Sequence, residues 1–258
     1  MRLFSYGTMK MKKTVFLLLF IMTNLFAEKL NIAVAANVGY AINDLVTAFN
    51  KTHPSTKVQI TLGGSGKLTA QINRGAPYDI LMSANMKYPQ SLYKTGQGAS
   101  KPRVYAQGAL ALFSAKVRDF SQGINIVKNK DIHRIAIANP KTAPYGKASV
   151  QALQNAKLYE AVKSKFIYGE SIAQTVAFSV TAADLGFIAK SALYSDKMQA
   201  YKENKNWIAL DTKLYTPIKQ GIIILKRAKT NTAAKAFYDF ISSTQAQKIF
   251  QRYGYTLP

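Results

Sequence analysis

Short apolar runs alternate with longer segments of helical periodicity along most of the sequence, and this alternation constrains the fold more than any other feature. The runs are rich in Ile, Val, Leu and Phe and lie at 30–36, 58–62, 80–83, 109–114, 134–139, 186–189 and 221–225. Runs of this length suit buried strands, and the segments between many of them suit helices that cover a sheet. The sequence therefore predicts an α/β protein.

Five segments have the spacing of helices that bury one face. In the first, Ala41, Ile42, Leu45, Val46 and Phe49 fall on one side of a helix that follows Asn37. The others are predicted after Gly66 with an end at Gly75, over 147–158, from Ser171 onward, and over 233–253. Ser171 and Gln174 have the spacing of a capping box, which indicates where the fourth helix begins.

Four short turns stand directly before the first four of these helices, at 36–37, 63–66, 143–146 and 170–172. The first N–H groups of a helix have no partner within the helix and carry about half a positive charge. Several helix starts that converge can therefore hold an anion with uncharged donors. The sequence predicts such an anion site, although each turn alone also fits a strand-to-helix connection without a ligand.

Two catalytic motifs that resemble the turn at 63–66 are not completed. A nucleophile elbow would need glycine at Lys67, and a phosphate-binding loop would need glycine at Thr61 and Ser or Thr at Leu68. His53 and His133 are read as surface residues, and no group of His, Asp and Glu has metal-ligand spacing. We therefore expect no enzyme activity and no cofactor. A hydrolase with Ser65 as nucleophile would lack a histidine partner.

Residues 1–27 are typical of a secretory signal peptide. Lys10, Lys12 and Lys13 precede an apolar run at 15–22, and a small residue, Ala27, ends the segment. The run is much shorter than the ~20 residues that cross a bilayer. The sequence has no cysteine, which excludes disulfides and a lipid-anchored cysteine. We therefore expect a soluble protein of the periplasm.

The net charge of the chain is +23, of which +19 falls on residues 28–258 because residues 1–27 hold four basic and no acidic side chains. Such a charge is typical of nucleic-acid binding. Here the lysines are scattered, without a basic stripe among aromatic residues, and an exported protein would not meet nucleic acid. We expect no nucleic-acid partner. A positive field would still speed the arrival of a small anion.

An ordered series of short segments resembles the periplasmic molybdate-binding protein family, the solute-capturing component of molybdate ABC importers. The segments are 35–37, 63–68, 75–85, 139–146, 185–189, 236–240 and 252–255, so the resemblance covers essentially all of residues 28–258. It implies a two-lobed type II binding-protein fold with the ligand in the interlobe cleft. We expect lobe 1 to comprise 28–106 plus 217–258, and lobe 2 to comprise 107–216.

The resemblance also implies a set of oxyanion-binding residues. Asn37 with the Ala36 amide would bind from the first turn, and Ser65 would bind through its amide and hydroxyl. Tyr145 and Ile172 would each contribute a backbone amide. Asn37, Tyr145 and the segment 186–189 together resemble a subgroup in which the asparagine side chain is also a donor, and Ala189 stands where other members have a tyrosine hydroxyl. Helix capping by Asn37 and simple packing by Tyr145 remain alternative readings.

The implied function is capture of molybdate or tungstate by a monomeric receptor that delivers the anion to an ABC permease. A donor-only site suits these fully ionised anions better than hydrogenphosphate, which needs an acceptor for its proton. A receptor of the same fold for sulfate or another small oxyanion is the nearest alternative. An adhesin or other interaction protein is a more distant one.

Overall fold

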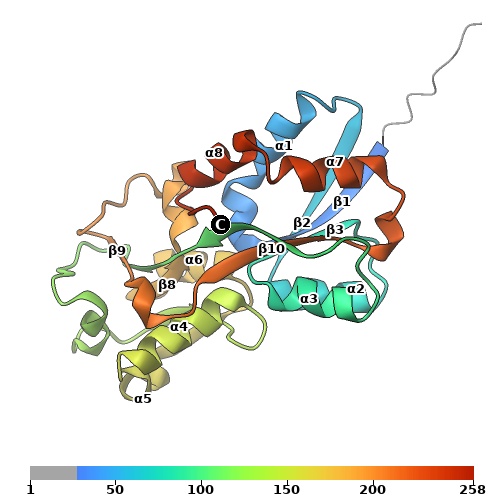
Figure 1. The fold of residues 1–258 in the computed structure, drawn as a ribbon. Helices are drawn as coiled ribbons and strands as arrows, with labels where there is room; N and C mark the ends of the chain where they lie inside the picture. Colours follow the sequence, from blue (N-terminus) through green and yellow to red (C-terminus); the bar gives the residue numbers. More distant parts are fainter. Residues whose placement is uncertain (1–27) are drawn as a thin grey trace, which may run out of the picture.

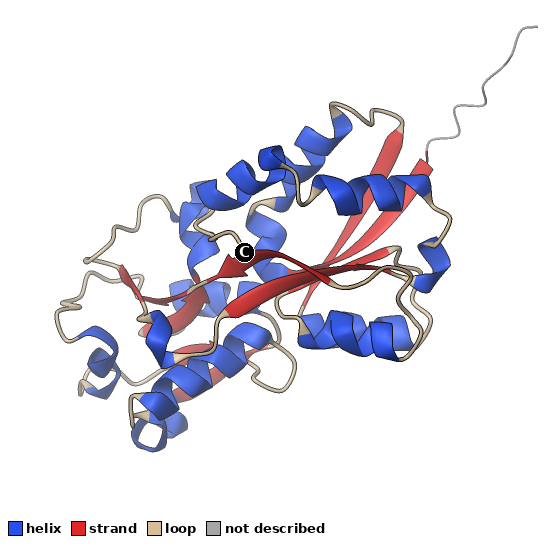
Figure 2. Cartoon of the chain, viewed as in Figure 1, coloured by secondary structure: helices blue, strands red, loops and turns tan. Residues whose placement is uncertain are grey.

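Two separate five-stranded mixed sheets form the centres of two lobes, as Figures 1 and 2 show for the computed structural model. The structure describes residues 28–258, and the predicted signal peptide lies outside the described residues. The strand orders are β2-β1-β3-β10-β4 and β7-β6-β8-β5-β9. The strands are β1 Glu28–Ala35, β2 Thr56–Gly63, β3 Ile80–Ser83, β4 Arg103–Gly108, β5 Leu110–Phe113, β6 Ile135–Ala138, β7 Phe166–Gly169, β8 Leu185–Ala189, β9 Trp207–Ala209 and β10 Ile218–Ile224.

Helices cover both faces of each sheet. The α-helices are α1 Ile42–Asn50, α2 Ser65–Asn73, α3 Lys87–Lys94, α4 Pro144–Asn155, α5 Tyr159–Val162, α6 Ile172–Thr181, α7 Thr232–Phe240 and α8 Thr244–Arg252. Short 3-10 helices are η1 Ala36–Tyr40, η2 Gly123–Lys128, η3 Lys163–Lys165, η4 Lys190–Tyr194, η5 Asp196–Met198, η6 Thr212–Leu214 and η7 Lys226–Ala228. No helix in this part of the chain is both long and apolar enough to span a bilayer.

In the first sheet, β1 pairs in parallel with β2 and β3, and β10 runs antiparallel to β3 and β4. Successive side chains of a strand point to opposite faces, so Leu30 and Ile32 pack with α1, α7 and α8, while Ala33 packs with α2 and α3. Figure 1 shows these two helical layers above and below the sheet.

In the second sheet, β6 is parallel to β7 and β8, and β5 is antiparallel to β8 and β9. Helix α4 packs on one face in a core with Leu112 and Ile137. Val176 of α6 belongs to a separate core with Phe113 and Ile188 on the other side. The central parallel strands β1, β3, β6 and β8 are thus largely buried, as their continuous apolar runs predict. The edge strand β2 is partly exposed, although the run 58–62 predicted a buried strand.

The chain passes between the sheets at two places. A single residue separates the end of β4 from the start of β5, and a short segment separates β9 from β10. The two-lobed α/β prediction is therefore confirmed. The expected lobe boundaries, with lobe 1 at 28–106 plus 217–258 and lobe 2 at 107–216, lie beside these crossings. We retain those boundaries as a proposal.

Several predicted elements have different bounds in the structure. Helix α4 begins at Pro144 rather than at 147, because proline suits the first turn, where no intrahelical N–H bond is lost. The predicted helical region 233–253 is two helices, and the Ser243 side chain caps the second by accepting from the Ala246 N–H. Strands β4, β7 and β9 lie outside the apolar runs from which strands were predicted.

Candidate anion-binding site

Four helix starts lie at the carboxyl ends of parallel strands in both lobes. Strand β1 leads directly into η1, and β2 leads through Gly64 into α2. In the other lobe, β6 leads through a short loop into α4, and β7 leads into α6. In open α/β sheets this edge is where ligands bind, because the helix N-termini gather there.

A small cavity lies where these helix starts meet. It is lined by Ala35, Ala36, Asn37, Gly63, Gly64, Ser65, Ala84, Ala143, Pro144, Tyr145 and Ile172. All five residues predicted for the site are in this set, and no charged side chain lines the cavity. The cavity volume is about 10 Å³, roughly what a single water molecule needs, so an organic solute would not fit between the lobes as they stand.

The backbone N–H groups of the predicted residues occupy first-turn positions. Ala36 and Asn37 open η1, Ser65 opens α2, Tyr145 is the second residue of α4, and Ile172 opens α6. The helix contains no carbonyl oxygen four residues before these positions, so their N–H groups are left for another partner. The cavity is therefore surrounded by neutral donors and by the positive ends of several peptide dipoles.

The Ile172 amide is left free by the way α6 is capped. Ser171 Oγ accepts from the Gln174 N–H at 3.3 Å, further into the helix, as its spacing predicts. The Gln174 side chain differs from a standard capping box, because its Oε1 accepts from the Glu170 N–H at 2.7 Å instead of from Ser171. Neither bond uses the Ile172 N–H.

The Ser65 hydroxyl is oriented by a neighbouring strand end. Its Oγ accepts from the Ala84 N–H at 3.0 Å, and the side chain is buried. This contact consumes an acceptor position of the hydroxyl and leaves its proton to be donated. Ser65 can therefore offer both an amide and a hydroxyl to one ligand atom or to two adjacent ones.

The side chain of Asn37, which the resemblance implies as an anion donor, is hydrogen-bonded within the protein. Its Nδ2 donates to Gln220 Oε1 at 2.9 Å and to the Tyr255 hydroxyl at 2.8 Å, with a weaker contact of 3.4 Å to the Tyr145 hydroxyl. The amide of asparagine has two hydrogens, so both are engaged by the protein. As the structure stands, both side-chain hydrogens of Asn37 are thus donated to protein oxygens, and its first-turn position is what makes its backbone N–H available to a ligand.

Tyr145 combines the two roles considered for it. Its ring is buried at 1% exposure and belongs to the core of lobe 2, while its backbone lines the cavity. Burial raises the pKa of its hydroxyl well above the ordinary value, with a smaller contribution from Tyr255. The hydroxyl is therefore neutral throughout the physiological range.

The lobes touch each other beside the cavity. The Gly66 N–H donates to the Thr142 carbonyl oxygen at 2.9 Å, and Lys67 Nζ lies 3.1 Å from Glu170 Oε2. A Cβ atom on Gly64 would lie 3.1 Å from the Glu170 carbonyl oxygen, so glycine allows this close approach. The structure is thus a closed arrangement of the lobes.

Gln220 and Tyr255 are polar partners of the site that the sequence analysis missed. Gln220 lies in β10, next to an apolar run, and is fully buried. A glutamine beside such a run is a signal that could have been used, because buried polar groups need partners. The link of Tyr255 to Asn37 spans 218 positions and has no local signal.

The two histidines lie away from the site. His53 stacks on Phe49 with ring centroids 4.3 Å apart, and His133 is exposed. Within residues 28–258, no three His, Asp or Glu side chains are grouped so that they could hold a metal ion.

The two sheets, the paired crossings and a small cavity between helix starts of both lobes define a two-lobed type II binding protein for a small solute. The sequence profile of the family described as bacterial extracellular solute-binding protein matches residues 30–256. The chain belongs to this family.

Individual relatives agree with this assignment. The molybdate-binding protein ModA of Azotobacter vinelandii is 37% identical over 233 residues, which cover 90% of this chain and 91% of that protein. ModA of Rhodobacter capsulatus is 33% identical over 86% of each chain. The solved structure of the Azotobacter vinelandii periplasmic molybdate-binding protein superposes with a TM-score of 0.82 at 30% identity, covering 89% of this chain and 99% of that one. These relatives are binding proteins, so the prediction that this chain is not an enzyme is confirmed.

Proposed function

We propose that this chain is a periplasmic receptor that holds molybdate or tungstate in the interlobe cavity. The observation that carries the proposal is the convergence of first-turn amides from both lobes on a cavity with no charged side chain in its lining. Two relatives of more than 30% identity are named for molybdate binding, which supports the choice of ligand.

The donors of the site would be the amides of Ala36, Asn37, Ser65, Tyr145 and Ile172, with the hydroxyl of Ser65. An anion held by neutral N–H groups gains charge-assisted hydrogen bonds without a counter-charge. A dianion without protons can accept from every donor, whereas a protonated anion presents one oxygen that must donate.

The receptor would act after export by the segment 1–27 and would hand its cargo, as a monomer, to an ABC permease. Lobe closure would enclose the anion, because its ligands come from helix starts on both sides of the cleft. The receptor would hold no resident cofactor, because the bound anion is the solute that it delivers. We include tungstate as a ligand because its charge and radius are nearly equal to those of molybdate.

Isothermal titration of residues 28–258 tests the proposal, with molybdate, tungstate and sulfate in a phosphate-free buffer. We expect one-to-one binding of molybdate and tungstate and much weaker binding of sulfate. Binding of sulfate alone would establish a receptor of the same fold for a smaller oxyanion. Absence of binding by all three anions would refute an oxyanion receptor and favour an interaction protein.

A further inference from the structure

The polar environment of Asn37 is built from parts of the chain that lie far apart in sequence. Besides its two side-chain donations, the Asn37 carbonyl oxygen accepts from the Tyr255 hydroxyl at 2.9 Å and from Ser191 Oγ at 3.1 Å. Tyr255 therefore both accepts from the side chain and donates to the backbone of the same residue. All three residues are buried.

The unused atom of the Asn37 side chain is an acceptor. Within the described residues, Oδ1 is buried and has no hydrogen-bond partner. Rotating the amide to present Nδ2 elsewhere would place Oδ1 against Gln220 Oε1, so two acceptors would face each other. The side chain as bonded has no hydrogen left for an oxyanion.

The partners of Asn37 lie in or beside the strands next to the two lobe crossings. Gln220 lies in β10, the strand that follows the second crossing, at a register shift of its pairing with β4. Its Nε2 donates to the Ile218 carbonyl oxygen at 3.0 Å, which fixes the orientation of its amide. Tyr255 precedes Thr256, whose N–H and carbonyl both pair with Gln107 of β4, the strand before the first crossing.

We propose that Gln220 and Tyr255 are positioning residues of the anion site, which act through Asn37 and not on the ligand. They hold the first turn of η1 against both interlobe segments, so that the Ala36 and Asn37 amides point into the cavity. This inference rests on the proposed oxyanion function. It goes further by assigning the Asn37 side chain to the hydrogen bonds with Gln220 and Tyr255. It also couples the site to the segments that cross between the lobes.

Burial supports the same arrangement. It raises the pKa of the Tyr255 hydroxyl well above the ordinary value, so the group stays protonated and can donate and accept at once. Neither Gln220 nor Tyr255 lines the cavity, which separates their action from direct contact with a ligand.

The test is titration of Tyr255→Phe and Gln220→Met with molybdate, each variant removing the acceptor of one Asn37 hydrogen at nearly constant volume. We expect affinity to fall roughly tenfold in each, the usual scale for a buried hydrogen bond left incomplete. Tyr253→Phe is the matched control, because Tyr253 bonds Asp44 and does not touch Asn37. Its affinity should equal that of the wild type.

A double-mutant cycle with Asn37→Ala separates positioning from a general loss of structure. If Gln220 acts through the Asn37 side chain, Gln220→Met should have little further effect on affinity in the Asn37→Ala background. Tyr255→Phe should keep part of its effect there, because the Tyr255 hydroxyl also donates to the Asn37 backbone carbonyl oxygen. Fully additive losses for Gln220→Met and Asn37→Ala would overturn the proposal. Amide NMR gives a second readout: molybdate should shift the backbone signals of Asn37 and Ile172 strongly and the Asn37 side-chain NH₂ signals weakly.

The outcomes of these experiments distinguish failure of the positioning role from failure of the proposed oxyanion-binding function. A wild-type protein that binds no oxyanion refutes the proposed function. A wild-type protein that binds molybdate with unchanged affinity in Tyr255→Phe and Gln220→Met refutes only the positioning role. Equal NMR shifts of the Asn37 side chain and backbone would assign the side chain to the ligand instead.

Discussion

Among the five predicted site residues, Ser65 is placed to offer an anion both its backbone and its side chain. Its Oγ accepts from the Ala84 N–H, and its hydroxyl proton is available to the cavity. Ser65→Ala should weaken molybdate binding by about 1–3 kcal/mol, because an anion oxygen loses a donor and the Ala84 N–H loses its acceptor. Isothermal titration measures the difference.

The matched control for this substitution is Ser179→Ala. Ser179 is also a buried helical serine, but its Oγ donates to the Thr175 carbonyl oxygen and does not line the cavity. Its affinity for molybdate should be unchanged. Equal losses in the two variants would show that Ser65 acts through stability alone.

Substitution of Gly66 should weaken ligand binding without lowering the stability of the protein. A Cβ atom there would lie 2.9 Å from the Thr142 carbonyl oxygen of the other lobe and 2.7 Å from the Tyr88 hydroxyl. Gly66→Ala should therefore obstruct closure and weaken binding about tenfold or more. The unfolding free energy without ligand should be unchanged or up to ~1 kcal/mol higher, because alanine favours a helix.

Titration calorimetry and urea unfolding check the two halves of this prediction. Gly39→Ala is the control, since its Cβ would approach only the end of the exposed Leu62 side chain, at 3.0 Å. A Gly66→Ala protein with normal affinity would contradict the closed interface as the binding state.

At the scale of secondary structure, sequence patterns predicted the elements whose apolar residues form a continuous run or one face of a helix. The run at 30–36 and the helix through Leu45 and Phe49 were readable because their apolar residues follow the period of a strand or of a helix. Strand β9 is three residues long and β7 ends in a glycine. Their strand form depends on pairing with β5 and β6, which no local pattern encodes.

The candidate site was predictable to a similar extent. Each turn before a helix has a local signal in small residues and capping residues, as at Gly63 and Ser171. The contacts behind the site join Asn37 to Gln220 and Tyr255 across 183 and 218 positions. Such contacts follow from the arrangement of the lobes, so the sequence predicted the residues that line the cavity but not those that hold Asn37.

The ion pair between α2 and the turn before α6 should make a small contribution to binding. The Lys67 and Glu170 side chains are 60% and 76% exposed, and the pair spans the lobes. Exposed pairs are worth about 0–1 kcal/mol and weaken with salt. Lys67→Met should lower molybdate affinity at most about fivefold at low salt, with little difference at high salt.

Titrations at two salt concentrations test this expectation. Lys147→Met serves as the control because Lys147 is an exposed lysine of α4 for which the described residues contain no ion pair. A loss for Lys67→Met that persists at high salt would point to direct anion contact by the ammonium group.

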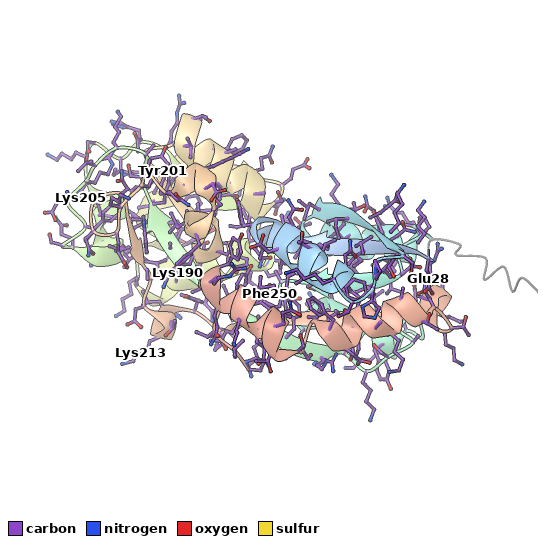
Figure 3. The ribbon with its side chains drawn as sticks, turned by 90° about the horizontal axis from the view of Figure 1, so that it is seen from above. Glu28, Lys190, Tyr201, Lys205, Lys213 and Phe250 are labelled. Atoms are coloured by element: carbon purple, nitrogen blue, oxygen red, sulfur yellow. The ribbon has the colours of Figure 1, made fainter. Side chains whose placement is uncertain are left out.

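For the whole molecule, the net charge of +19 on residues 28–258 should act on the rate of capture. Figure 3 shows labelled lysines, such as Lys205 and Lys213, well separated on the surface. A distributed positive field attracts an anion from a distance but is screened beyond about 10 Å at 0.1 M salt. The molybdate association rate should therefore fall as salt rises, with a nearly constant dissociation rate.

Stopped-flow tyrosine or tryptophan fluorescence can measure both rates. Sodium chloride and a neutral osmolyte of matched viscosity should be compared, so that slower diffusion is not mistaken for screening. A dissociation rate that carries the whole salt effect would contradict long-range attraction.

Alkaline conditions should destabilise the fold through its buried tyrosines. Burial raises the pKa of Tyr105, Tyr145 and Tyr255 above the ordinary value of 10.0. Above that value the unfolded chain loses these protons while the folded chain keeps them, so the unfolding free energy falls as pH rises. Below about pH 9 these groups should contribute no slope.

Urea unfolding at about pH 8 and about pH 11 measures this dependence. Other groups, lysines among them, titrate in the same range, so the informative comparison is between the wild type and Tyr255→Phe. The variant should lose less stability over the interval. An identical loss would show that the buried hydroxyl does not govern the alkaline response.

The predominance of backbone donors around the cavity has a consequence for how such a chain changes over generations. Every amino acid except proline carries a backbone N–H, so ordinary substitutions at Ala36, Tyr145 or Ile172 leave the donor in place. Sequence drift at these positions is tolerated chemically as long as the helix starts keep their places. Anion binding is therefore encoded mainly by the many residues that position the helix starts. Proline at one of these positions would remove a backbone donor.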